Sequence, residues 1–364
     1  MTRPASLLLA MFLAGPLAAA QPVPETVTVW TSGEDGYHTY RIPGLVVTPR
    51  DTVLAFCEGR KTSRSDHGDI DLLVKRSSDG GRAWSDQHIV HEEGGTEKIT
   101  IGNPCPVVDE TSGTVHLAFC RNNDRVFVTQ SRDDGVTWTE PREITDAVKA
   151  PEWDWYATGP GHGIRKRRDP HKGRLIVPCD HRVKGREGGW RGGGRSHVIY
   201  SDDGGRTWHR GGATAFGMNE CEVAERADGS LLLAMRNYHG KNRRAFAVSR
   251  DAGRTWSEPE HHDAVYCPTC QASLHRYAFE PRNVILYSGP GGPGRKSLTV
   301  RLSPDEGKTW PTARVLHDGP TAYSDLAVLP GRDVACLFEA GTKHPYETIR
   351  FARFPLAWLT GEGP

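Results

Sequence analysis

Two short stretches of the sequence hold carboxylates at spacings that suit acid–base chemistry. Glu220 and Glu222 stand two residues apart in "MNECEV", so on a β-strand, whose side chains alternate between faces, both would share one face. Asp66, Asp69 and Asp71 stand close together in "RSDHGDID". Carboxyl groups in such positions can exchange protons with a reacting bond. The three aspartates equally suit a turn or a strand edge, and spacing alone leaves these alternatives open.

Eight cysteines stand at positions 57, 105, 120, 179, 221, 267, 270 and 336. An even number permits disulfides, but the sequence does not give their pairing. Those at 57, 120, 179 and 336 end apolar, strand-like runs and equally suit small buried hydrophobic residues. The pair Cys267 and Cys270 in "CPTC" lacks a second pair at zinc-ligand spacing. We therefore expect no metal site and no cofactor.

The charges of the chain are balanced, with 46 Lys and Arg against 45 Asp and Glu. A formal net charge of +1 gives no reason to expect a nucleic-acid partner or binding to an anionic membrane. The densest basic run, "RKRR" at 165–168, lies between glycines and a proline, which is typical of a solvated loop.

The first twenty residues have the pattern of a secretory signal. Arg3 is followed by the apolar run "SLLLAMFLAGPLAAA", which ends in small residues. This run is short and contains a proline, so it does not suit a membrane span. We expect cleavage near Ala20–Gln21, a secreted or periplasmic protein, and a single domain over residues 21–364.

One eight-residue motif, S-x-D-x-G-x-x-W, occurs five times. Its copies are "SSDGGRAW" at 77–84, "SRDDGVTW" at 131–138, "SDDGGRTW" at 201–208, "SRDAGRTW" at 249–256 and "SPDEGKTW" at 303–310. β-Branched and aromatic runs precede the copies, which indicates that each is the tip of a hairpin. The glycine suits a positive φ, the aspartate can accept hydrogen bonds from turn amides, and the tryptophan can cover the hairpin.

The spacing of these tips predicts an all-β propeller. Successive tryptophans are 48 to 70 residues apart, which allows about four strands for each repeat. Five copies imply at least five blades, and the segments before the first and after the last leave material for a sixth, closed by both ends of the chain. Each motif copy is then structural, so the function must come from residues elsewhere.

Several stretches outside the motif copies resemble exo-α-sialidases, the neuraminidases of glycoside hydrolase family 33. They cover nearly all of the chain after residue 20, in the family's order: "YRIPGLVV" at 40–47, "CEGRKTSRSDHGDIDLLVKRSSDGG" at 57–81, "TGPGHGI" at 158–164, "MNECEV" at 218–223, "LLLAMR" at 231–236, "CQASL" at 270–274 and "TAYSDLAVL" at 321–329. The fold that this resemblance implies is a six-bladed β-propeller with five Asp-box (BNR) repeats.

The resemblance implies a cluster of three arginines that binds the carboxylate of a sialic acid. They are Arg41, Arg236 and Arg295, with Arg301 as the alternative to the third. Arginine suits this role because its planar guanidinium stays charged and can bind a carboxylate through two hydrogen bonds.

The resemblance also implies a tyrosine nucleophile, Tyr323, with Glu220 as its base and Glu222 as the alternative base. Sialidases are known exceptions to the use of a carboxylate nucleophile. A physical reason is that a carboxylate ~4 Å from the substrate's own carboxylate would be repelled by about 4 kcal/mol at an effective dielectric constant of about 20. A neutral tyrosine avoids this repulsion, but its usual pKa requires a base.

By the same resemblance, Asp66 is the general acid, with Asp69 as the second choice. Arg60 and Asn103 match positions that contact the O4 side of the sugar, although the family often has an acid in place of the asparagine. The run "WDWY" at 153–156 suits either an aromatic wall of the substrate site or packing within the propeller.

The resulting hypothesis is a secreted exo-α-sialidase that releases terminal sialic acids from glycoproteins, glycolipids and oligosaccharides with retention of configuration. One alternative is a hydrolase for another anionic sugar, such as a deaminated sialic acid. A second is a propeller that binds glycans without cleaving them. The occurrence of Arg, Tyr, Glu and Asp at the motif positions favours an enzyme.

Overall fold

The apolar runs of the sequence form antiparallel strands in a computed structural model, which describes residues 23–95 and 97–362. The predicted signal segment, 1–20, lies outside the described residues. Four sheets consist of strands that follow one another along the chain. The first holds β2 (Thr39–Val47), β3 (Val53–Arg60), β4 (Ile70–Ser77) and β5 (His88–His91). The second holds β6 (Ile101–Asp109), β7 (Thr114–Arg121), β8 (Arg125–Ser131) and β9 (Arg142–Glu143).

The third sheet holds β10 (Trp153–Thr158), β12 (Leu175–Val183), β13 (Gly194–Ser201) and β14 (His209–Ala213), and the short β11 (Ile164–Arg165) pairs with β12. The fourth holds β15 (Met218–Glu225), β16 (Leu231–Asn237), β17 (Arg243–Ser249) and β18 (Glu260–Tyr266). The three helices are short: α1 (Thr145–Val148), α2 (Gly189–Gly193) and α3 (Leu356–Thr360).

The remaining strands form one seven-stranded sheet. They are β19 (Ser273–Phe279), β20 (Arg282–Pro290), β21 (Lys296–Ser303), β22 (Thr312–Val328), β23 (Val334–Ala340), β24 (Thr348–Phe354) and β1 (Glu25–Thr31). The long strand β22 joins its two halves, because residues 312–320 pair with β21 and residues 321–328 pair with β23. The N-terminal strand β1 pairs with the C-terminal β24, so the two ends of the chain meet in one sheet.

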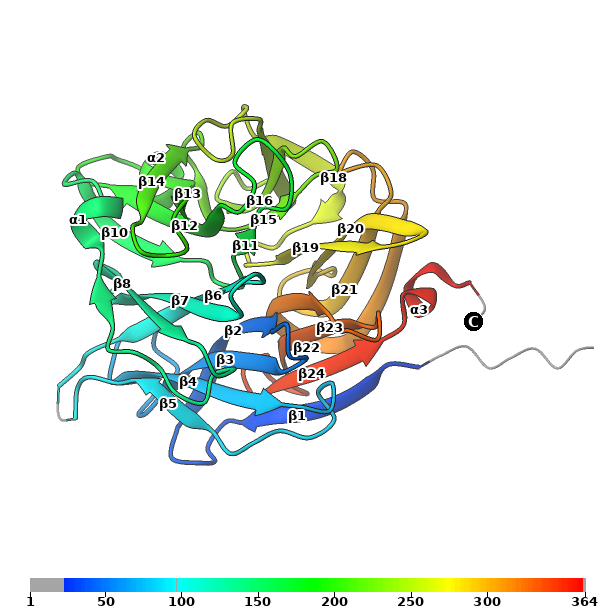
Figure 1. The fold of residues 1–364 in the computed structure, drawn as a ribbon, viewed down its shortest axis with the longest axis horizontal. Helices are drawn as coiled ribbons and strands as arrows, with labels where there is room; N and C mark the ends of the chain where they lie inside the picture. Colours follow the sequence, from blue (N-terminus) through cyan, green and yellow to red (C-terminus); the bar gives the residue numbers. More distant parts are fainter. Residues whose placement is uncertain (1–22, 96, 363–364) are drawn as a thin grey trace, which may run out of the picture.

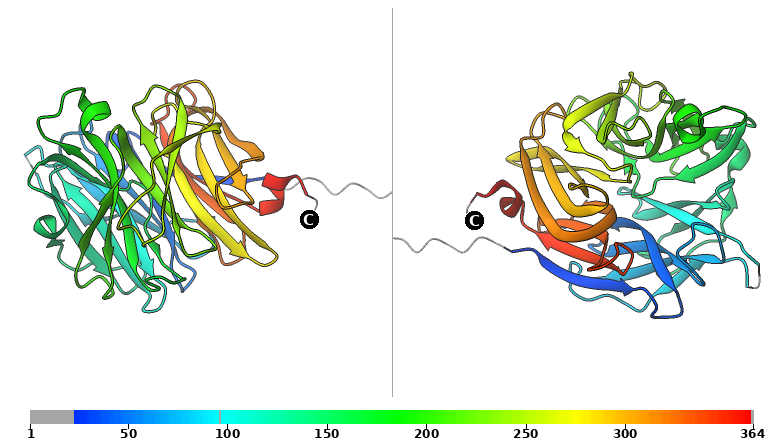
Figure 2. Two further views of the ribbon diagram at one scale, coloured as in Figure 1. Left: turned by 90° about the horizontal axis from the view of Figure 1, so that it is seen from above. Right: turned by 180° about the vertical axis from the view of Figure 1, so that it is seen from behind.

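These sheets stand around a common axis as in a β-propeller (Figure 1), and the predicted all-β propeller is confirmed at that level. The colours in Figure 1 run once around the ring, and Figure 2 shows the ring from above and from behind. Contacts around the axis run from β2 to β6, β12, β15, β19 and β22 and back to β2. No helix in the described ranges is long and apolar enough to cross a membrane.

The five motif copies form hairpin tips with the same hydrogen bonds. In each copy the glycine amide donates to the serine hydroxyl at 2.8–2.9 Å. The aspartate accepts a hydrogen bond from the amide four residues further on, and the glycine has a φ between +77° and +92°. The predicted turn chemistry is present in every copy.

Each tip also packs against the preceding sheet, which the sequence did not predict. A Cβ added to Gly205 would lie 2.3 Å from the ring of His116 on β7. The corresponding neighbours of the other four motif glycines are Phe351, Leu54, Val198 and Leu232. The first tip touches β24 of the last sheet, so these contacts run all the way around the ring.

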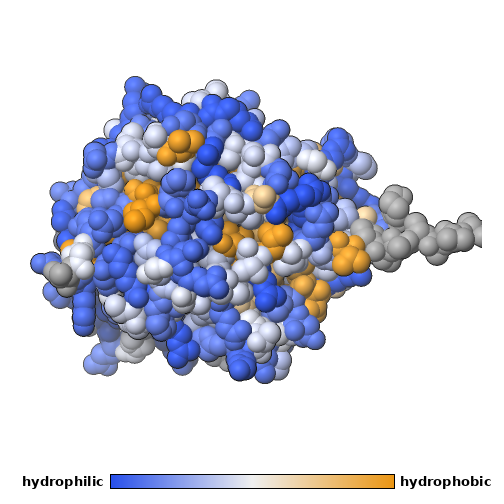
Figure 3. All heavy atoms as spheres, turned by 90° about the horizontal axis from the view of Figure 1, so that it is seen from below, coloured by the Kyte–Doolittle hydropathy of each residue, from blue (hydrophilic) through white to orange (hydrophobic). Residues whose placement is uncertain are grey.

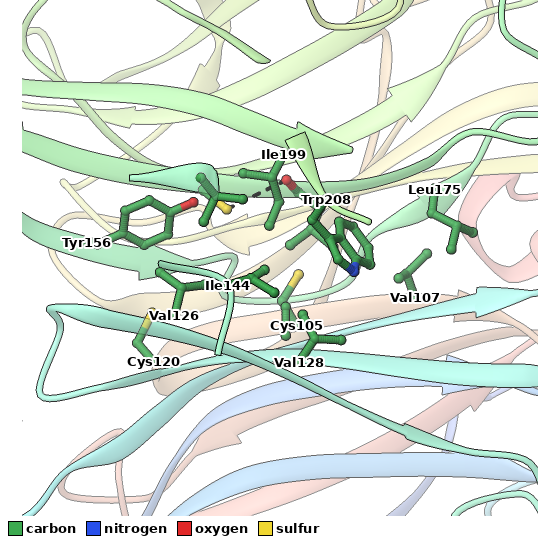
Figure 4. Close-up of a cluster of buried hydrophobic side chains, with 14 of the residues drawn as sticks. Cys105, Val107, Cys120, Val126, Val128, Ile144, Tyr156, Leu175, Ile199 and Trp208 are labelled. Atoms are coloured by element: carbon green, nitrogen blue, oxygen red, sulfur yellow. Dashed lines mark hydrogen bonds between the residues drawn. The ribbon is translucent and has the colours of Figure 1, made fainter. Parts of the chain in front are cut away.

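Apolar clusters fill the space between adjacent sheets. Figure 4 shows one of them, in which Trp208 of the third motif copy packs with side chains of two sheets. Only 2% of Trp208 is exposed. All eight cysteines are free and buried, which confirms the buried-hydrophobe alternative for the four at strand ends. The side of the molecule in Figure 3 is mostly hydrophilic, with apolar residues in separate patches.

A hydrogen-bonded polar cluster occupies the axis. His162 donates from Nδ1 to Asp325 at 2.7 Å, and Ser273 lies within hydrogen-bond distance of both Asp325 and Glu222. Asp325 also accepts a hydrogen bond from the backbone amide of Leu45 on β2. These contacts join strands from several sheets at the centre of the ring.

The prediction of a solvated loop at 165–168 is wrong for Lys166. This side chain is fully buried and donates to Glu225 at 2.8 Å and to the carbonyl oxygen of Gly229. A buried ammonium group needs such a partner, and the acid comes from a strand about sixty residues further along the chain. Arg167 alone in this run is largely exposed.

Candidate active site

The predicted site residues gather at one end of the axis, where the axial strands begin. Arg41 lies near the start of β2, Asn103 near the start of β6 and Glu220 near the start of β15. Tyr323 lies near the start of the half of β22 that pairs with β23. A propeller brings these strands together around the axis, although their residues are far apart in the sequence.

Tyr323 lies between a carboxylate and guanidinium groups. Its hydroxyl donates a short hydrogen bond to Glu220 Oε1. Arg236 Nη1 lies 3.0 Å from the tyrosine oxygen and 2.7 Å from Glu220 Oε2. Burial and the Glu220 carboxylate raise the pKa of Tyr323 far above its usual value, while nearby arginines lower it only in part. The phenol is therefore neutral, with an acceptor already in contact with its proton.

Two further arginines complete a cationic cluster. The guanidinium carbon of Arg41 lies 4.9 Å from the centre of the Tyr323 ring, and that of Arg295 lies 5.5 Å from it. The structure thus brings Arg295 to Tyr323. The alternative, Arg301, lies on β21, opposite Tyr287 of the neighbouring strand β20.

Two residues that support this cluster were missed in the sequence. Glu339 on β23 is fully buried and accepts hydrogen bonds from Arg41 at 2.8 and 3.3 Å and from the amide of Tyr323. Tyr346 lies under the Arg41 guanidinium, 3.8 Å from ring centre to carbon, and accepts a hydrogen bond from Arg295. Glu339 is the only acid in the apolar strand "VACLFEA". That pattern could have indicated its role, because a buried carboxylate needs a partner.

Asp66 lies on the loop after β3, with 67% of its side chain exposed. Its Oδ1 is 2.7 Å from Arg60 and 3.5 Å from Arg41. Partial burial acts to raise the pKa of Asp66, but the charges of Arg60 and Arg41 outweigh it and hold the pKa below its usual value. Arg60 also forms two hydrogen bonds with Glu58, which accepts a third from the amide of Asn103.

The alternative acids have other partners. Asp69 pairs with Lys61 at 3.2 Å. Glu222 is fully buried in the axial cluster, where it accepts hydrogen bonds from Gln271, Ser273 and the amide of Leu274. Neither contacts Tyr323, whereas Glu220 does.

Tyr323 and Glu220 line a cavity of about 160 Å³. Arg60, Asp66, Asn103 and Arg236 line it, together with residues that the sequence analysis did not select: Ile42, Glu58, Asn123, Ala157, Asp180, Trp190, Asn219 and Tyr238. The residues of the "WDWY" run take both predicted roles, one in the cavity wall and others in propeller packing. Trp155 lines the cavity, whereas Trp153 stacks 3.5 Å from the buried His181 and Tyr156 is buried in the same core.

A larger cavity, about 410 Å³, opens at the opposite end of the axis, where the axial strands end. Its arginines are paired with carboxylates, as in Arg276 with Glu306 at 2.8 Å and Arg165 with Asp109 at 2.9 Å. Among the described residues that line it there is no tyrosine paired with a base, so the smaller cavity is the better candidate for chemistry.

Within the described residues, one group of side chains is close enough to share a metal ion: His162, Glu222 and Asp325. All four of their carboxylate oxygens already accept hydrogen bonds from protein donors. This pattern fits a structural polar cluster better than a metal centre. The two cysteines of "CPTC" are buried and belong to no such group among the residues described.

Taken together, the geometry suits a substrate with a carboxylate beside its reacting carbon. The guanidinium cluster can bind the carboxylate, the neutral Tyr323 can approach it without repulsion, and Glu220 can take the phenolic proton. Asp66, which also lines the cavity, has an exposed carboxyl group that can reach a leaving group.

Comparisons with known proteins identify the family of this chain. Residues 51–336 match the BNR repeat-like domain family. The chain is 33% identical to a sialidase of Micromonospora viridifaciens, over 91% of this chain and 53% of that protein. It is 31% identical to Sialidase-3 of Mus musculus, over 90% of this chain and 93% of that protein.

Among solved structures, the chain is similar to the Hadza microbial sialidase Hz136, with a TM-score of 0.82 and 30% sequence identity. The match covers 92% of this chain and 69% of that one. This chain spans about half the length of the Micromonospora relative. The family match over most of the chain, together with relatives that it covers almost completely, shows that the protein belongs to the sialidase family.

Proposed function

We propose that this protein is an exo-α-sialidase that hydrolyses terminal α-linked sialic acids of glycoproteins, glycolipids and oligosaccharides with retention of configuration. The observation that carries the proposal is the placement of Tyr323, whose phenol contacts both Glu220 and Arg236 beside Arg41 and Arg295. A tyrosine held against a base within a cationic cluster suits displacement at a carbon that bears a carboxylate.

In the proposed reaction, Arg41, Arg236 and Arg295 bind the substrate carboxylate. The phenolic oxygen of Tyr323 attacks the anomeric carbon as its proton passes to Glu220, and the bond to the leaving oxygen breaks. Asp66 donates a proton to that oxygen. Asp66 then takes a proton from water, which attacks the same carbon, while the tyrosine leaves and recovers its proton from Glu220. Two displacements give retention.

Asp66 must change its surroundings to act as an acid. In the free protein Arg41 and Arg60 favour its ionised form. A substrate carboxylate bound to Arg41 would replace Asp66 there and supply a negative charge nearby, which raises the pKa of a neighbouring carboxyl group. We propose that Arg60 and Asn103 then contact the O4 side of the sugar.

The remaining sequence predictions are part of this proposal. We propose a six-bladed propeller in which β22 serves two blades, one domain over residues 21–364, and secretion or periplasmic export directed by residues 1–20. The pairing of β1 with β24 supports closure of the sixth blade by both ends of the chain.

Covalent labelling tests the proposed nucleophile. A 3-fluoro sialosyl fluoride should add one glycosyl group to the protein, which peptide mapping should locate in "TAYSDLAVL". The variant Tyr323→Phe should fold, lose labelling and lose hydrolysis of a fluorogenic sialoside by orders of magnitude. Tyr238→Phe is the matched control, because this tyrosine also accepts a hydrogen bond from Arg236, at 2.8 Å. A label on Glu220 or Asp66 would contradict the assignment.

The same assay separates the alternative functions. Turnover of the fluorogenic sialoside rules out a propeller that only binds glycans. A comparison of N-acetylated and deaminated substrates shows which sugar is preferred. Proton NMR of the first-formed product identifies the anomer, and release of the β-anomer from an α-sialoside would refute retention.

A further inference from the structure

The cavity of about 410 Å³ at the end of the axis opposite Tyr323 has no role in the proposed reaction. Its walls come from strands of several sheets and from the segment around β11. Its volume falls within the range of small-molecule sites, which are mostly apolar with a few polar groups at fixed positions. The chemistry of the walls therefore indicates what kind of molecule would fit.

Much of the wall is apolar and incompletely covered. Five apolar side chains that line the cavity are partly exposed: Val47, Val108, Ile164, Phe279 and Val328. They come from four different sheets, so together they form one apolar surface around the axis. Covering such a surface with an apolar ligand is favourable through the hydrophobic effect.

The wall also carries a positive charge that lacks a carboxylate of its own. Lys166 and Arg168 share Glu225, which already accepts a hydrogen bond from Lys166 at 2.8 Å and others from two backbone amides. The Arg168 guanidinium lies 3.7 Å from Glu225, and 34% of the Arg168 side chain is exposed. This guanidinium forms no hydrogen bond with any residue that the structure describes.

The remaining arginines of the wall each have a separate acid. The pairs are Arg165 with Asp109, Arg167 with Glu110 and Arg276 with Glu306. Arg168 is therefore the guanidinium best able to bind the acidic group of a ligand, and an anion there would restore the balance of charge.

A second polar group lies in the same wall. His275 Nδ1 lies 2.9 Å from Nε2 of His162, whose Nδ1 donates to Asp325. In the neutral pair His162 Nε2 accepts this hydrogen bond, so His275 keeps a lone pair at Nε2. Burial and the neighbouring His162 and Arg167 lower the pKa of His275 well below its usual value, which favours the neutral ring. Within the described chain His275 Nε2 has no partner, so it can accept a hydrogen bond from a ligand.

We propose that this cavity binds a small amphiphilic anion, with its apolar body against the exposed apolar side chains, its acidic group on Arg168 and a hydroxyl or N–H group at His275. A neutral apolar molecule would leave Arg168 without a partner, and a fully hydrophilic anion would leave the apolar wall uncovered. The site lies at the other end of the axis from the arginine cluster, so it does not depend on the proposed sialidase reaction.

Dye binding tests the proposal. The probe is 8-anilinonaphthalene-1-sulfonate, which combines apolar rings, an N–H group and a sulfonate, and whose fluorescence rises in apolar surroundings. Titration should show one saturable site on the folded protein. Decanoate should displace the dye, and decanol, which lacks the charge, should do so at least about tenfold more weakly, as expected when a charge-assisted hydrogen bond is lost. Equal displacement by the two would contradict a role for the charge.

Competition separates this site from the arginine cluster. A 2,3-unsaturated sialic acid, which carries the carboxylate that the cluster is proposed to bind, should leave the dye in place. Displacement of the dye by this compound would mean that the dye binds beside Tyr323, and the inference would then be wrong.

Two matched pairs of variants locate the bound dye. Arg168→Ala should raise its Kd by about tenfold, whereas Arg206→Ala, at an exposed arginine of the third hairpin tip, should not change it. Ala278→Trp, at an exposed position that lines the cavity, should block binding. Ala264→Trp, at an exposed alanine of β18 outside the cavity, is its control. All four variants should fold and keep the sialoside hydrolysis of the wild type, because none of these residues lies near Tyr323.

Three results would overturn the inference. The first is a wild-type protein that shows no saturable binding of the dye. The second is dye binding that survives in Ala278→Trp or falls equally in both tryptophan variants. The third is uptake of several dye molecules per chain with the same affinity in every variant, which is the pattern of adsorption to scattered apolar surface.

Discussion

At the scale of single residues, Asp66 is the side chain whose surroundings in the free protein differ most from its proposed role. Its carboxylate pairs with Arg60 and Arg41, and its pKa is held low. A general acid works best with a pKa near the operating pH. The exposure of its loop gives Asp66 room to leave these arginines when a substrate carboxylate arrives.

A leaving-group comparison tests this role. Asp66→Asn should lower kcat/KM for a natural disaccharide linkage by about 10²–10⁴-fold, because the poor leaving group needs a proton. For a methylumbelliferyl sialoside, whose leaving group is stable as an anion, the loss should be much smaller. Asp69→Asn should show no such difference between substrates, since Asp69 pairs with Lys61 away from the arginine cluster. Equal losses on both substrates in Asp66→Asn would exclude the acid role.

The residues proposed to react were easier to predict from the sequence than the residues that support them. Tyr323, Glu220 and Arg236 meet as expected because each lies in a recognisable local motif. Glu339 and Asp180 were missed because each is a single acid in an apolar strand, and only the closed ring shows what it faces. Glu339 pairs with Arg41 of the first sheet, and Asp180 accepts a hydrogen bond from Asn219 of the fourth.

At the scale of elements, each hairpin tip makes two kinds of contact: hydrogen bonds within the motif, and packing against the preceding sheet. Their internal hydrogen bonds follow from the motif, and these were predictable because all the atoms lie within eight residues. Their contacts with the preceding sheet were not predictable, because neighbours such as His116 and Phe351 lie far away in the sequence. For the same reason, the burial of Lys166 against Glu225 could not be predicted from its basic neighbours.

Two adjacent glycines of the third motif copy distinguish backbone strain in the tip from its contact with the preceding sheet. Gly204 and Gly205 have φ values of +71° and +82°, so alanine is strained at both, by about 1–2 kcal/mol. A Cβ at Gly204 meets no atom within 4 Å, whereas at Gly205 it lies 2.3 Å from His116. Gly205→Ala should therefore destabilise the fold by about 1–3 kcal/mol more than Gly204→Ala.

The measurement is the free energy of unfolding from urea titration of the two variants side by side. The kcat/KM of the folded protein should not change in either, because the tip lies outside the cavity. Equal destabilisation by the two substitutions would mean that packing of the tip against the preceding sheet does not contribute to stability.

At the scale of the whole molecule, buried histidines link stability to pH. Burial lowers the pKa of His181 to about 3 and that of His116 to about 4, and the pKa of His197 also lies well below its usual value. In the unfolded chain the pKa of each histidine would be about 6.5. Between these values the unfolded chain binds more protons than the folded protein, so stability falls as the pH falls below about 6.5.

We expect each such histidine to contribute up to about 1.4 kcal/mol of lost stability per pH unit in this range. Urea unfolding at pH 7.5, 6 and 5 measures the slope. The double variant His181→Gln/His197→Gln should reduce it, whereas His88→Gln, at an exposed position on β5, serves as the control. A slope unaffected by the double variant would exclude these histidines as its source.

The eight buried thiols give the folded and unfolded chains different chemical reactivities. In the folded protein no cysteine is accessible, and burial raises the pKa of Cys120 and Cys270 to about 12, so little reactive thiolate forms. Unfolding exposes all eight at once, free to form mixed and intermolecular disulfides. Thermal unfolding without a reductant should therefore become irreversible, while a reductant should restore refolding. A thiol-reactive dye should label none of the eight in the native protein and all of them in denaturant. The extent of labelling at intermediate times then measures the fraction of molecules that have unfolded.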